Sequence, residues 1–408
     1  METRSKRVDI TSAAVPPINR KRVKPKKKAR KTQSDSAAVR LNEDDDSLIA
    51  SVNTTGLPTL PDELLLEIMS YYPIHTDTMS LSSSWRNRTW KPEDARAHAE
   101  WRDTLLSLSQ TCRNFRRFFR PYLWRRIEVC AGMHVGDGVL GSDDRSFNTE
   151  LVRQLEIVTV RDPSLAEYVK LLNIEVRDFS TQHVLAELAR CMALFPNLHS
   201  VRLYIPSREC SSSKVLSLAQ KAFSKYIYPQ IDSVTVSHIA YPLLRSCPSV
   251  RSVNRMGLDI SLIGDTGFGE WIRGYCTRLE QYSVTFADTE FKENLKALPY
   301  LRIISLEFDD DIYSSFSETF KVLATMKHLQ KVTLFPFSVI QQKDRQQILD
   351  WVVGILLELQ KEDGEAKEVT IRYTDALSPS QSHHENQPFR QSKRVYLPAP
   401  KPQTSHGP

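Results

Sequence analysis

Three closely spaced glycines are the first candidates for a chemical role in this sequence. Gly136, Gly138 and Gly141 have the spacing of the dinucleotide-binding fingerprint. In that motif the glycines follow a strand and open a helix whose N-terminus holds a pyrophosphate. Here they lead into Ser-Asp-Asp-Arg-Ser at 142–146, a composition typical of a turn. The sequence therefore favours a flexible joint over a nucleotide site.

Motifs for metal binding and nucleophilic catalysis are also incomplete. Asp309, Asp310 and Asp311 follow an apolar run and could coordinate a cation, but such a run is more often a solvated loop. The ten histidines show no His-Glu-x-x-His spacing, and there is no Gly-x-Ser-x-Gly elbow, Walker loop or Cys-x-x-Cys pair. We predict no catalytic residue, no metal site and no cofactor.

The cysteines and the apolar runs limit the class of protein further. The cysteines are scattered without a close pair, which is typical of reduced core thiols in an intracellular protein. They are Cys112, Cys130, Cys191, Cys210, Cys247 and Cys276. No apolar run reaches the roughly 18 residues that span a bilayer, and the N-terminal residues lack the apolar stretch of a secretory signal. We expect no membrane partner.

A short amphipathic segment after residue 60 predicts a helix. Pro61 has no amide to leave unpaired, and the two carboxylates that follow it suit the positive end of a helix dipole. From there Leu64, Ile68 and Tyr72 fall on one face at four-residue spacing. A helix this short has more apolar surface than it can bury alone.

A second, longer helical pattern covers residues 92–119 and is expected to end at Pro121. Its apolar residues recur at spacings of three and four. They are Trp101, Leu105, Leu108, Cys112, Phe115 and Phe119. A plain helical hairpin whose stripes form its own core would show the same periodicity.

The order of three short motifs separates these two interpretations. Leu60-Pro61 opens the first helix, Leu-x-Leu-Ser-x-Thr-Cys-Arg-x-Phe occupies 106–115, and Leu123-Trp124 follows. Together they make residues 57–127 resemble an F-box. The resemblance implies a surface that docks the adaptor of a cullin-RING ubiquitin ligase. One departure is the insertion at 73–103, since the two helices are usually joined by a short turn.

The resemblance also implies which residues meet the adaptor or support the helices that do. They are Leu60, Pro61, Leu64, Leu65, Ile68, Leu105, Leu108, Phe115, Leu123 and Trp124. Within the insertion, the second half is read as an extension of the second helix. Residues 80–90 are expected to be its mobile part.

The net charge of +6 is unevenly distributed. Residues 1–40 carry +10 and residues 376–408 carry +3, which leaves −7 on the rest. Nine cations in the twelve residues 20–31 look like a nuclear-import signal read by importin. They are Arg20, Lys21, Arg22, Lys24, Lys26, Lys27, Lys28, Arg30 and Lys31. Weak attraction to phosphate backbones and a merely solvated arm are the alternatives, and without interleaved aromatics base stacking is not expected.

A recurring pattern of apolar, two variable, apolar, one variable, apolar follows the F-box. Eight copies begin at Val169, Leu198, Ile231, Val250, Leu279, Leu301, Leu329 and Ala366, with Arg255 interrupting the fourth. Their spacing averages about 28 residues, within the range of leucine-rich repeats, about 20–29. Helix, turn and short strand would then stack into a parallel sheet. An ordinary compact α/β domain is the alternative.

We therefore predict an α/β chain in which a helical F-box precedes a degenerate leucine-rich-repeat solenoid, similar to F-box proteins with divergent repeats that are abundant in fungi and plants. The predicted divisions are a disordered basic arm at 1–56, the F-box at 57–127, a linker and first helix at 128–160, the repeat domain at 161–375 and a disordered tail at 376–408. In the tail, Phe389–Leu397 is read either as a short linear motif or as solvated chain.

The functional prediction is a nuclear substrate receptor of a ubiquitin ligase, without catalysis of its own. Its expected partners are the adaptor, the cullin scaffold, importin and a protein substrate whose binding residues are unknown. A non-degradative interaction scaffold is one alternative. The other is a nucleic-acid-binding regulator that uses the basic arm, which the acidic body disfavours.

Overall fold

The computed structural model describes residues 56, 59–71, 92–130, 134–135, 138–139, 146–177, 180–206, 212–256, 267–285, 291–308, 321–336, 342–363, 365–373 and 391–399. The chain divides into two units, 1–52 and 53–408, and the described residues all belong to the second. The nine predicted import residues at 20–31, the segment 80–90 and Asp309–Asp311 lie outside the described residues.

Three helices open the described chain: α1 at Asp62–Ser70, α2 at Pro92–Thr111 and α3 at Arg113–Leu123. The prediction of one helix over 92–119 is wrong, because the helix is interrupted at Cys112. Its backbone is extended, with φ −156° and ψ 170°, and its Sγ accepts a hydrogen bond from the Phe115 amide at 3.5 Å. Cys112 thereby caps a new helix.

Pro121 does not end the second pattern as predicted. It lies inside α3, which continues to Leu123. A proline within a helix removes one backbone hydrogen bond and crowds the preceding turn. In α3 this happens in the last turn, where few bonds remain, and the Trp124 amide still donates to the Arg120 carbonyl at 3.1 Å.

One sheet of ten strands follows, in chain order among the described residues. The strands are β1 Arg126–Val129, β4 Leu171–Glu175, β5 Ser200–Tyr204, β6 Ser233–Val236, β7 Ser252–Arg255, β8 Gln281–Thr285, β9 Ile303–Phe308, β10 Lys331–Pro336, β11 Lys367–Tyr373 and β12 Gln391–Leu397. Neighbours pair in parallel except β11 and β12, which are antiparallel. The predicted parallel sheet is thus present.

The register places one fully buried residue of each of the first nine strands in a single row. The row is Ile127, Leu172, Val201, Val234, Val253, Tyr282, Ile304, Val332 and Val369. From Leu172 onward these are the central apolar positions of the eight predicted copies. Arg255 does not interrupt the array, because it still pairs with Val236 at the end of β7.

A short turn recurs before seven of the described strands. In each turn, the backbone amide of residue i+3 donates a hydrogen bond to the backbone carbonyl of residue i, with nitrogen-to-oxygen distances of 3.0–3.3 Å. The accepting residues are Ala166, Phe195, Tyr228, Cys247, Cys276, Leu298 and Met326. Cys247 and Cys276 therefore occupy equivalent positions as buried turn residues.

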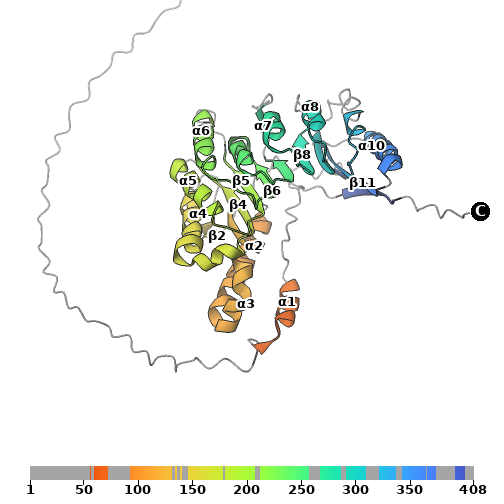
Figure 1. The fold of residues 1–408 in the computed structure, drawn as a ribbon. Helices are drawn as coiled ribbons and strands as arrows, with labels where there is room; N and C mark the ends of the chain where they lie inside the picture. The colour runs from red at the N-terminus through yellow and green to blue at the C-terminus, as the bar shows by residue number, and fades with distance from the viewer. Residues whose placement is uncertain are drawn as a thin grey trace, which may run out of the picture. The chain divides into compact units, whose positions relative to one another are not determined.

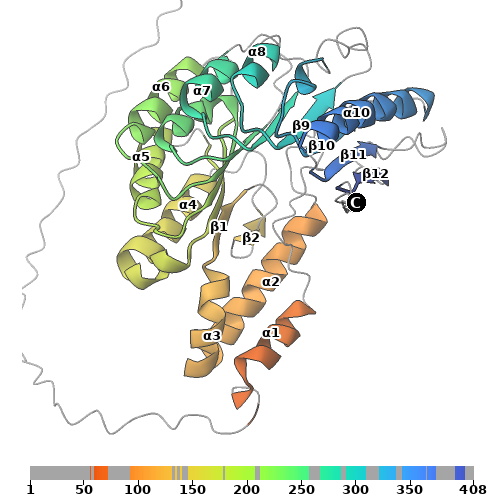
Figure 2. The same cartoon turned by 45° about the vertical axis from the view of Figure 1, so that its right-hand side comes forward.

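Helices connect the strands. They are α4 Ser146–Glu156, which continues into the π-helix η3 Ile157–Arg161, the 3-10 helix η4 Pro163–Tyr168, α5 Thr181–Met192, α6 Ser212–Phe223, the 3-10 helix η5 His238–Ser246, α7 Gly267–Tyr275, α8 Phe291–Lys296 and α10 Gln342–Asp363. In Figure 1, α4, α5 and α6 run beside the first strands, and Figure 2 shows α4 to α7 following one another along one side of the sheet.

Two strands lie where the sequence predicts none. β1 begins at Arg126 and is the first strand of the sheet, although the sequence assigns it to the end of the F-box and a linker. Gln391–Leu397, predicted to belong to a disordered tail, forms β12. An edge strand is held mainly by backbone hydrogen bonds to its neighbour, so β12 needs little apolar content; only Val395 and Leu397 pack against the core.

Candidate protein-docking surface

The sequence around Pro61 fixes where α1 begins. Pro61 adopts φ −54° and ψ 149°, and its carbonyl accepts hydrogen bonds from the amides of Leu64 and Leu65 at 3.0 and 3.2 Å. Asp62 and Glu63 stand in the first turn, where carboxylates interact favourably with the helix dipole. This start is the one predicted, and it sets the rotation of the helix.

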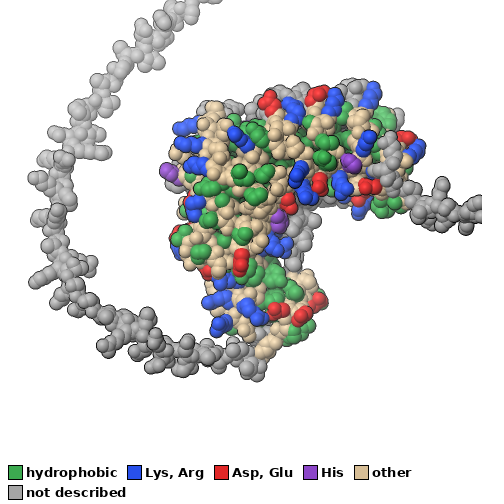
Figure 3. Space-filling model, in the orientation of Figure 1, with side chains coloured by type: hydrophobic (Ala, Val, Ile, Leu, Met, Phe, Trp, Pro, Cys, Tyr) green, Lys and Arg blue, Asp and Glu red, His purple; other side chains and the backbone are tan. Residues whose placement is uncertain are grey.

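Two apolar stripes run along α1, and only one of them is buried. Leu65 and Met69 are 5% and 4% exposed, whereas Leu64 and Ile68 are 49% and 42% exposed. Both pairs have the four-residue spacing that brings side chains together on a helix. The surface in this region carries hydrophobic side chains, as Figure 3 shows where Figure 1 draws α1.

We call the exposed stripe the α1 face: Pro61, Leu64, Ile68 and Tyr71. Tyr71, which the sequence analysis did not single out, is 78% exposed and lies three residues beyond Ile68. Tyr72, predicted for this face, lies outside the described residues. Exposed apolar side chains that cluster on one short helix are typical of a protein-interaction surface.

The buried stripe of α1 belongs to a small core of its own. Its other members come from α2 and α3: Leu105, Phe115, Phe118, Phe119 and Leu123. Aromatic rings meet edge to face, with centroids 5.3 Å apart for Phe115 and Phe119 and 4.9 Å apart for Phe118 and Phe119. This aromatic core holds α1 so that its other stripe faces outward.

The ten residues predicted for adaptor binding therefore divide into three groups. Leu65, Leu105, Phe115 and Leu123 are buried, which suits residues that support the helices and do not contact a partner directly. Pro61, Leu64 and Ile68 are exposed. Leu60, Leu108 and Trp124 are half-buried at the margin of the aromatic core.

Exposed apolar residues that the prediction missed are Leu66, Tyr71 and Leu106. Leu66 is 45% and Leu106 is 40% exposed. Leu66 and Leu106 each follow a buried leucine, and consecutive helix residues point about 100° apart. Knowing which of two adjacent leucines is buried was the missing signal.

Charged side chains join this helical region to the start of the sheet. The Arg102 guanidinium of α2 lies 6.0 Å from the centre of the Trp124 ring. Burial lowers the pKa of Arg102, while the carboxylates of Glu150 and Glu128 act in the opposite direction. Glu128 also pairs with Arg126 at 2.7 Å. An ion pair between Arg120 of α3 and Asp162 adds a second link.

The other candidate sites give no chemistry in the part of the chain that is described. Gly138 lies in the strand β3, Gly138–Val139, which pairs with β2, His134–Val135, and not at a strand-to-helix turn. No three His, Cys, Asp or Glu side chains among the described residues are grouped to hold a metal. No described helix is long and apolar enough to cross a bilayer.

The described cysteines are all free thiols. Burial raises the pKa of Cys276 to about 12 and that of Cys191 to about 12. It raises the pKa of Cys247 as well. A thiol must lose its proton to act as a nucleophile or a metal ligand, so these three side chains behave as apolar core residues.

A protein-family model described as F-box-like matches residues 57–129 of this chain. This segment is an F-box-like domain. The match agrees with the predicted F-box at 57–127 and spans the insertion at 73–103. The F-box-like domain contains the α1 face and the aromatic core beneath it. It is consistent with docking to the adaptor of a ubiquitin ligase.

The other comparisons do not assign the rest of the chain to a family. No curated protein matches the chain. A solved structure of "Leiomodin-1 Actin-Binding Site 2 (ABS2)" is similar at 12% identity and a TM-score of 0.18, covering 51% of this chain and 91% of that one.

Proposed function

We propose that this chain is the substrate-recognition subunit of a cullin-RING ubiquitin ligase and that its F-box-like domain docks the adaptor through the α1 face. The observation that carries the proposal is the exposure of Leu64 and Ile68 beside the buried pair Leu65 and Met69. Burial of apolar surface against a partner favours association. The α1 face offers such surface, and the aromatic core packs against the other side of the helix.

Docking is tested by co-purification of the full-length chain with the adaptor. The double substitution Leu64→Ala and Ile68→Ala removes the centre of the α1 face. Truncating a buried contact costs roughly 1–2 kcal/mol, and each 1.4 kcal/mol is about tenfold in affinity. We expect the dissociation constant to rise by at least about tenfold, measured by calorimetry.

The matched control is Leu66→Ala. Leu66 is as exposed as Leu64 but lies about 160° away from it around the helix axis, by the helical period. We expect this variant to bind the adaptor like the wild type. A wild-type chain that does not bind the adaptor, or a double variant that binds it unchanged, would rule out docking through the α1 face.

We further propose that residues 161–375 are a degenerate leucine-rich-repeat domain that holds the substrate. The support is the single row of buried apolar residues across successive strands and the turn that recurs before seven of them. In such an array each unit contacts its neighbours, and the strands provide one extended surface. The residues that bind a substrate are not predicted.

In this proposal the chain acts by proximity and has no chemistry of its own. It holds a substrate lysine near a ubiquitin-charged enzyme that other subunits supply, which raises the effective concentration of the reacting groups. The cullin scaffold links this chain to that enzyme. Importin binding by the cations at 20–31 would bring the complex to the nucleus, where the substrate is then expected.

A further inference from the structure

One side of α3 is lined by arginines. They recur at spacings of three and four and fall within an arc of about 100° by the helical period. The aromatic core occupies another side of the helix, through Phe115, Phe118 and Phe119. Figure 3 shows basic side chains where Figure 1 draws α3. We call this row of arginines the α3 face: Arg113, Arg116, Arg117 and Arg120.

The α3 face lacks the carboxylates that accompany cations on several other helices. Four described helices carry a cation that pairs with the glutamate three residues earlier, at 2.6–2.9 Å. These cations are Arg153, Arg190, Lys296 and Lys361. The sequence of α3 is Arg-Asn-Phe-Arg-Arg-Phe-Phe-Arg-Pro-Tyr-Leu, without a carboxylate. Because like charges at these spacings destabilise a helix, the α3 face is unfavourable for α3 itself.

Carboxylates from other elements compensate two of the four charges. Arg117 pairs with Asp62 of α1 at 3.4 Å, and Arg120 pairs with Asp162, the residue before η4. The Arg117 and Asp62 side chains are 73% and 56% exposed. Ion pairs this exposed contribute little stability. Arg117 can therefore exchange this carboxylate for one that a partner supplies.

The other two charges lie at the start of α3 and form no ion pair with a described residue. Arg113 is exposed, and the exposed Arg116 donates from Nε to the Ser109 backbone carbonyl at 3.3 Å. A carbonyl satisfies the donor but does not neutralise the charge. Cations are also unfavourable near the positive end of a helix dipole. Carboxylates from a partner would offset both effects.

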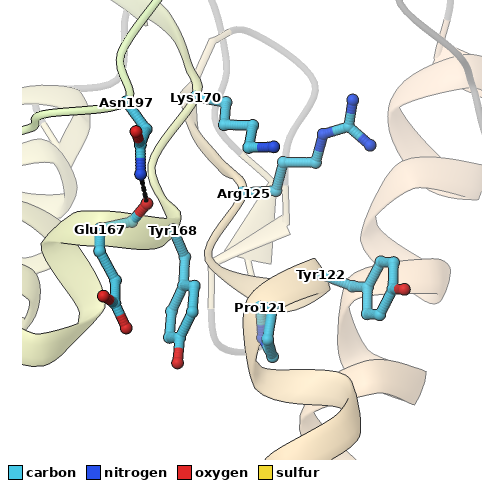
Figure 4. Close-up of a pocket in the computed structure, with 7 residues that line it drawn as sticks. All are labelled: Pro121, Tyr122, Arg125, Glu167, Tyr168, Lys170 and Asn197. Atoms are coloured by element: carbon cyan, nitrogen blue, oxygen red, sulfur yellow. Dashed lines mark hydrogen bonds between the residues drawn. The ribbon is translucent and has the colours of Figure 1, made fainter. Parts of the chain in front are cut away.

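The surroundings of the α3 face restrict the shape of its partner. On one side, α1 carries three carboxylates and is joined to α3 by an ion pair. At the end of α3, Figure 4 shows Pro121 and Tyr122 on one side of a hollow of about 540 Å³ and Glu167 on the other. The row from Arg113 to Arg120 is about 10 Å long by the helical rise. A nucleic-acid duplex or a membrane is broader and would bring phosphates toward these carboxylates, which disfavours both.

We propose that the α3 face binds an acidic segment of a partner protein, with Arg113, Arg116 and Arg117 contacting its Asp and Glu side chains. A guanidinium matches a carboxylate in shape and forms two parallel hydrogen bonds with it. Arg117 reaches α1 at Asp62, which lies about 160° from Leu64 around the helix axis. The α3 face is therefore distinct from the α1 face, and this partner is additional to the proposed adaptor.

The test uses the full-length chain and a hexaglutamate peptide that carries a photoreactive diazirine, and mass spectrometry maps the labelled residues. This mapping separates labelling of α3 from labelling of the basic arm, which also attracts acidic peptides. We expect labelling within residues 109–124 that falls as the ionic strength rises, because salt screens exposed charges. Labelling confined to residues 1–40 would overturn the proposal.

The double substitution Arg113→Gln and Arg117→Gln should raise the peptide concentration for half-maximal labelling of α3 by about fivefold, since each exposed ion pair contributes modestly. Both side chains are exposed, so the variant should fold. Arg278→Gln with Arg302→Gln is the matched control. It removes two exposed arginines before β8 and β9 and changes the net charge equally. We expect the control to be labelled like the wild type.

Equal labelling of α3 in the double variant and the wild type, or an equal loss in the control, would also overturn the proposal. Competition tests the class of partner. If hexathymidylate displaces the peptide from α3 at a lower concentration than unlabelled hexaglutamate, the face binds nucleic acid and not an acidic protein. Adaptor affinity of the double variant tests whether the two faces are distinct. Unchanged affinity supports an additional partner, and loss of adaptor binding would overturn it.

Discussion

Gly269 of α7 has no room for a side chain. A Cβ at this position would lie 2.4 Å from Nδ2 and 2.5 Å from Oδ1 of Asn294, well inside contact distance. Asn294 is fully buried, and its Oδ1 accepts a hydrogen bond from Arg273 at 2.6 Å. The amide therefore cannot swing away without losing this bond.

The expected result of Gly269→Ala is a loss of stability of about 1–3 kcal/mol, as for other overpacked sites. Gly274→Ala in the same helix meets nothing within 4 Å. Alanine is favoured over glycine in a helix by about 0.8–1 kcal/mol, so Gly274→Ala should leave stability unchanged or raise it. Urea unfolding of both variants measures the difference, and equal stabilities would contradict the close approach.

At the scale of elements, one carboxylate connects the last three strands. Glu368 of β11 accepts hydrogen bonds from Arg394 of β12 at 2.6 Å and pairs with Lys331 of β10 at 2.9 Å. Burial alone would raise the pKa of Glu368. The hydrogen bonds from Arg394, Lys331 and Thr370 outweigh burial and hold the pKa at about 2.

This pKa predicts acid sensitivity for the docking of β12. The folded-state pKa is below the ordinary value of 4.5, so Glu368 contributes stability above pH 4.5 that is lost as the pH falls toward 2. Arg394→Gln should raise the pKa of Glu368 and shrink the loss over that range. Unfolding followed from pH 5 to pH 2 tests this, and an unchanged pH dependence in the variant would count against it.

The elements also show what the residue pattern could and could not predict. The strands β4 to β11 follow from apolar residues whose spacing repeats, because each copy fills the same buried row. β1 was missed since Arg126 and Glu128 alternate with only two apolar residues. In α1 both stripes are apolar, so periodicity alone could not tell which one the aromatic core covers. The buried stripe is determined by contacts with α2 and α3, whose contacting residues follow the insertion in the sequence.

At the scale of the whole molecule, we predict separate roles for the basic arm and for the α1 face. Residues 1–40 carry +10 and the central part carries −7, while the α1 face lies in the F-box-like domain. Deleting residues 1–40 should therefore abolish nuclear accumulation of a fluorescent fusion and leave adaptor affinity within about twofold, because docking is mainly apolar. Continued nuclear accumulation would refute import through the arm, and loss of adaptor binding would refute the separation.

The antiparallel strand β12 has a consequence for solubility. Parallel strands added in chain order leave an open edge at the end of the sheet, and such edges can pair with other molecules and aggregate. β12 covers the edge of β11 in the reverse direction and carries exposed Lys393 and Arg394. Charged residues on an outer strand discourage further pairing. We therefore expect β12 to disfavour edge-to-edge pairing between copies of the chain.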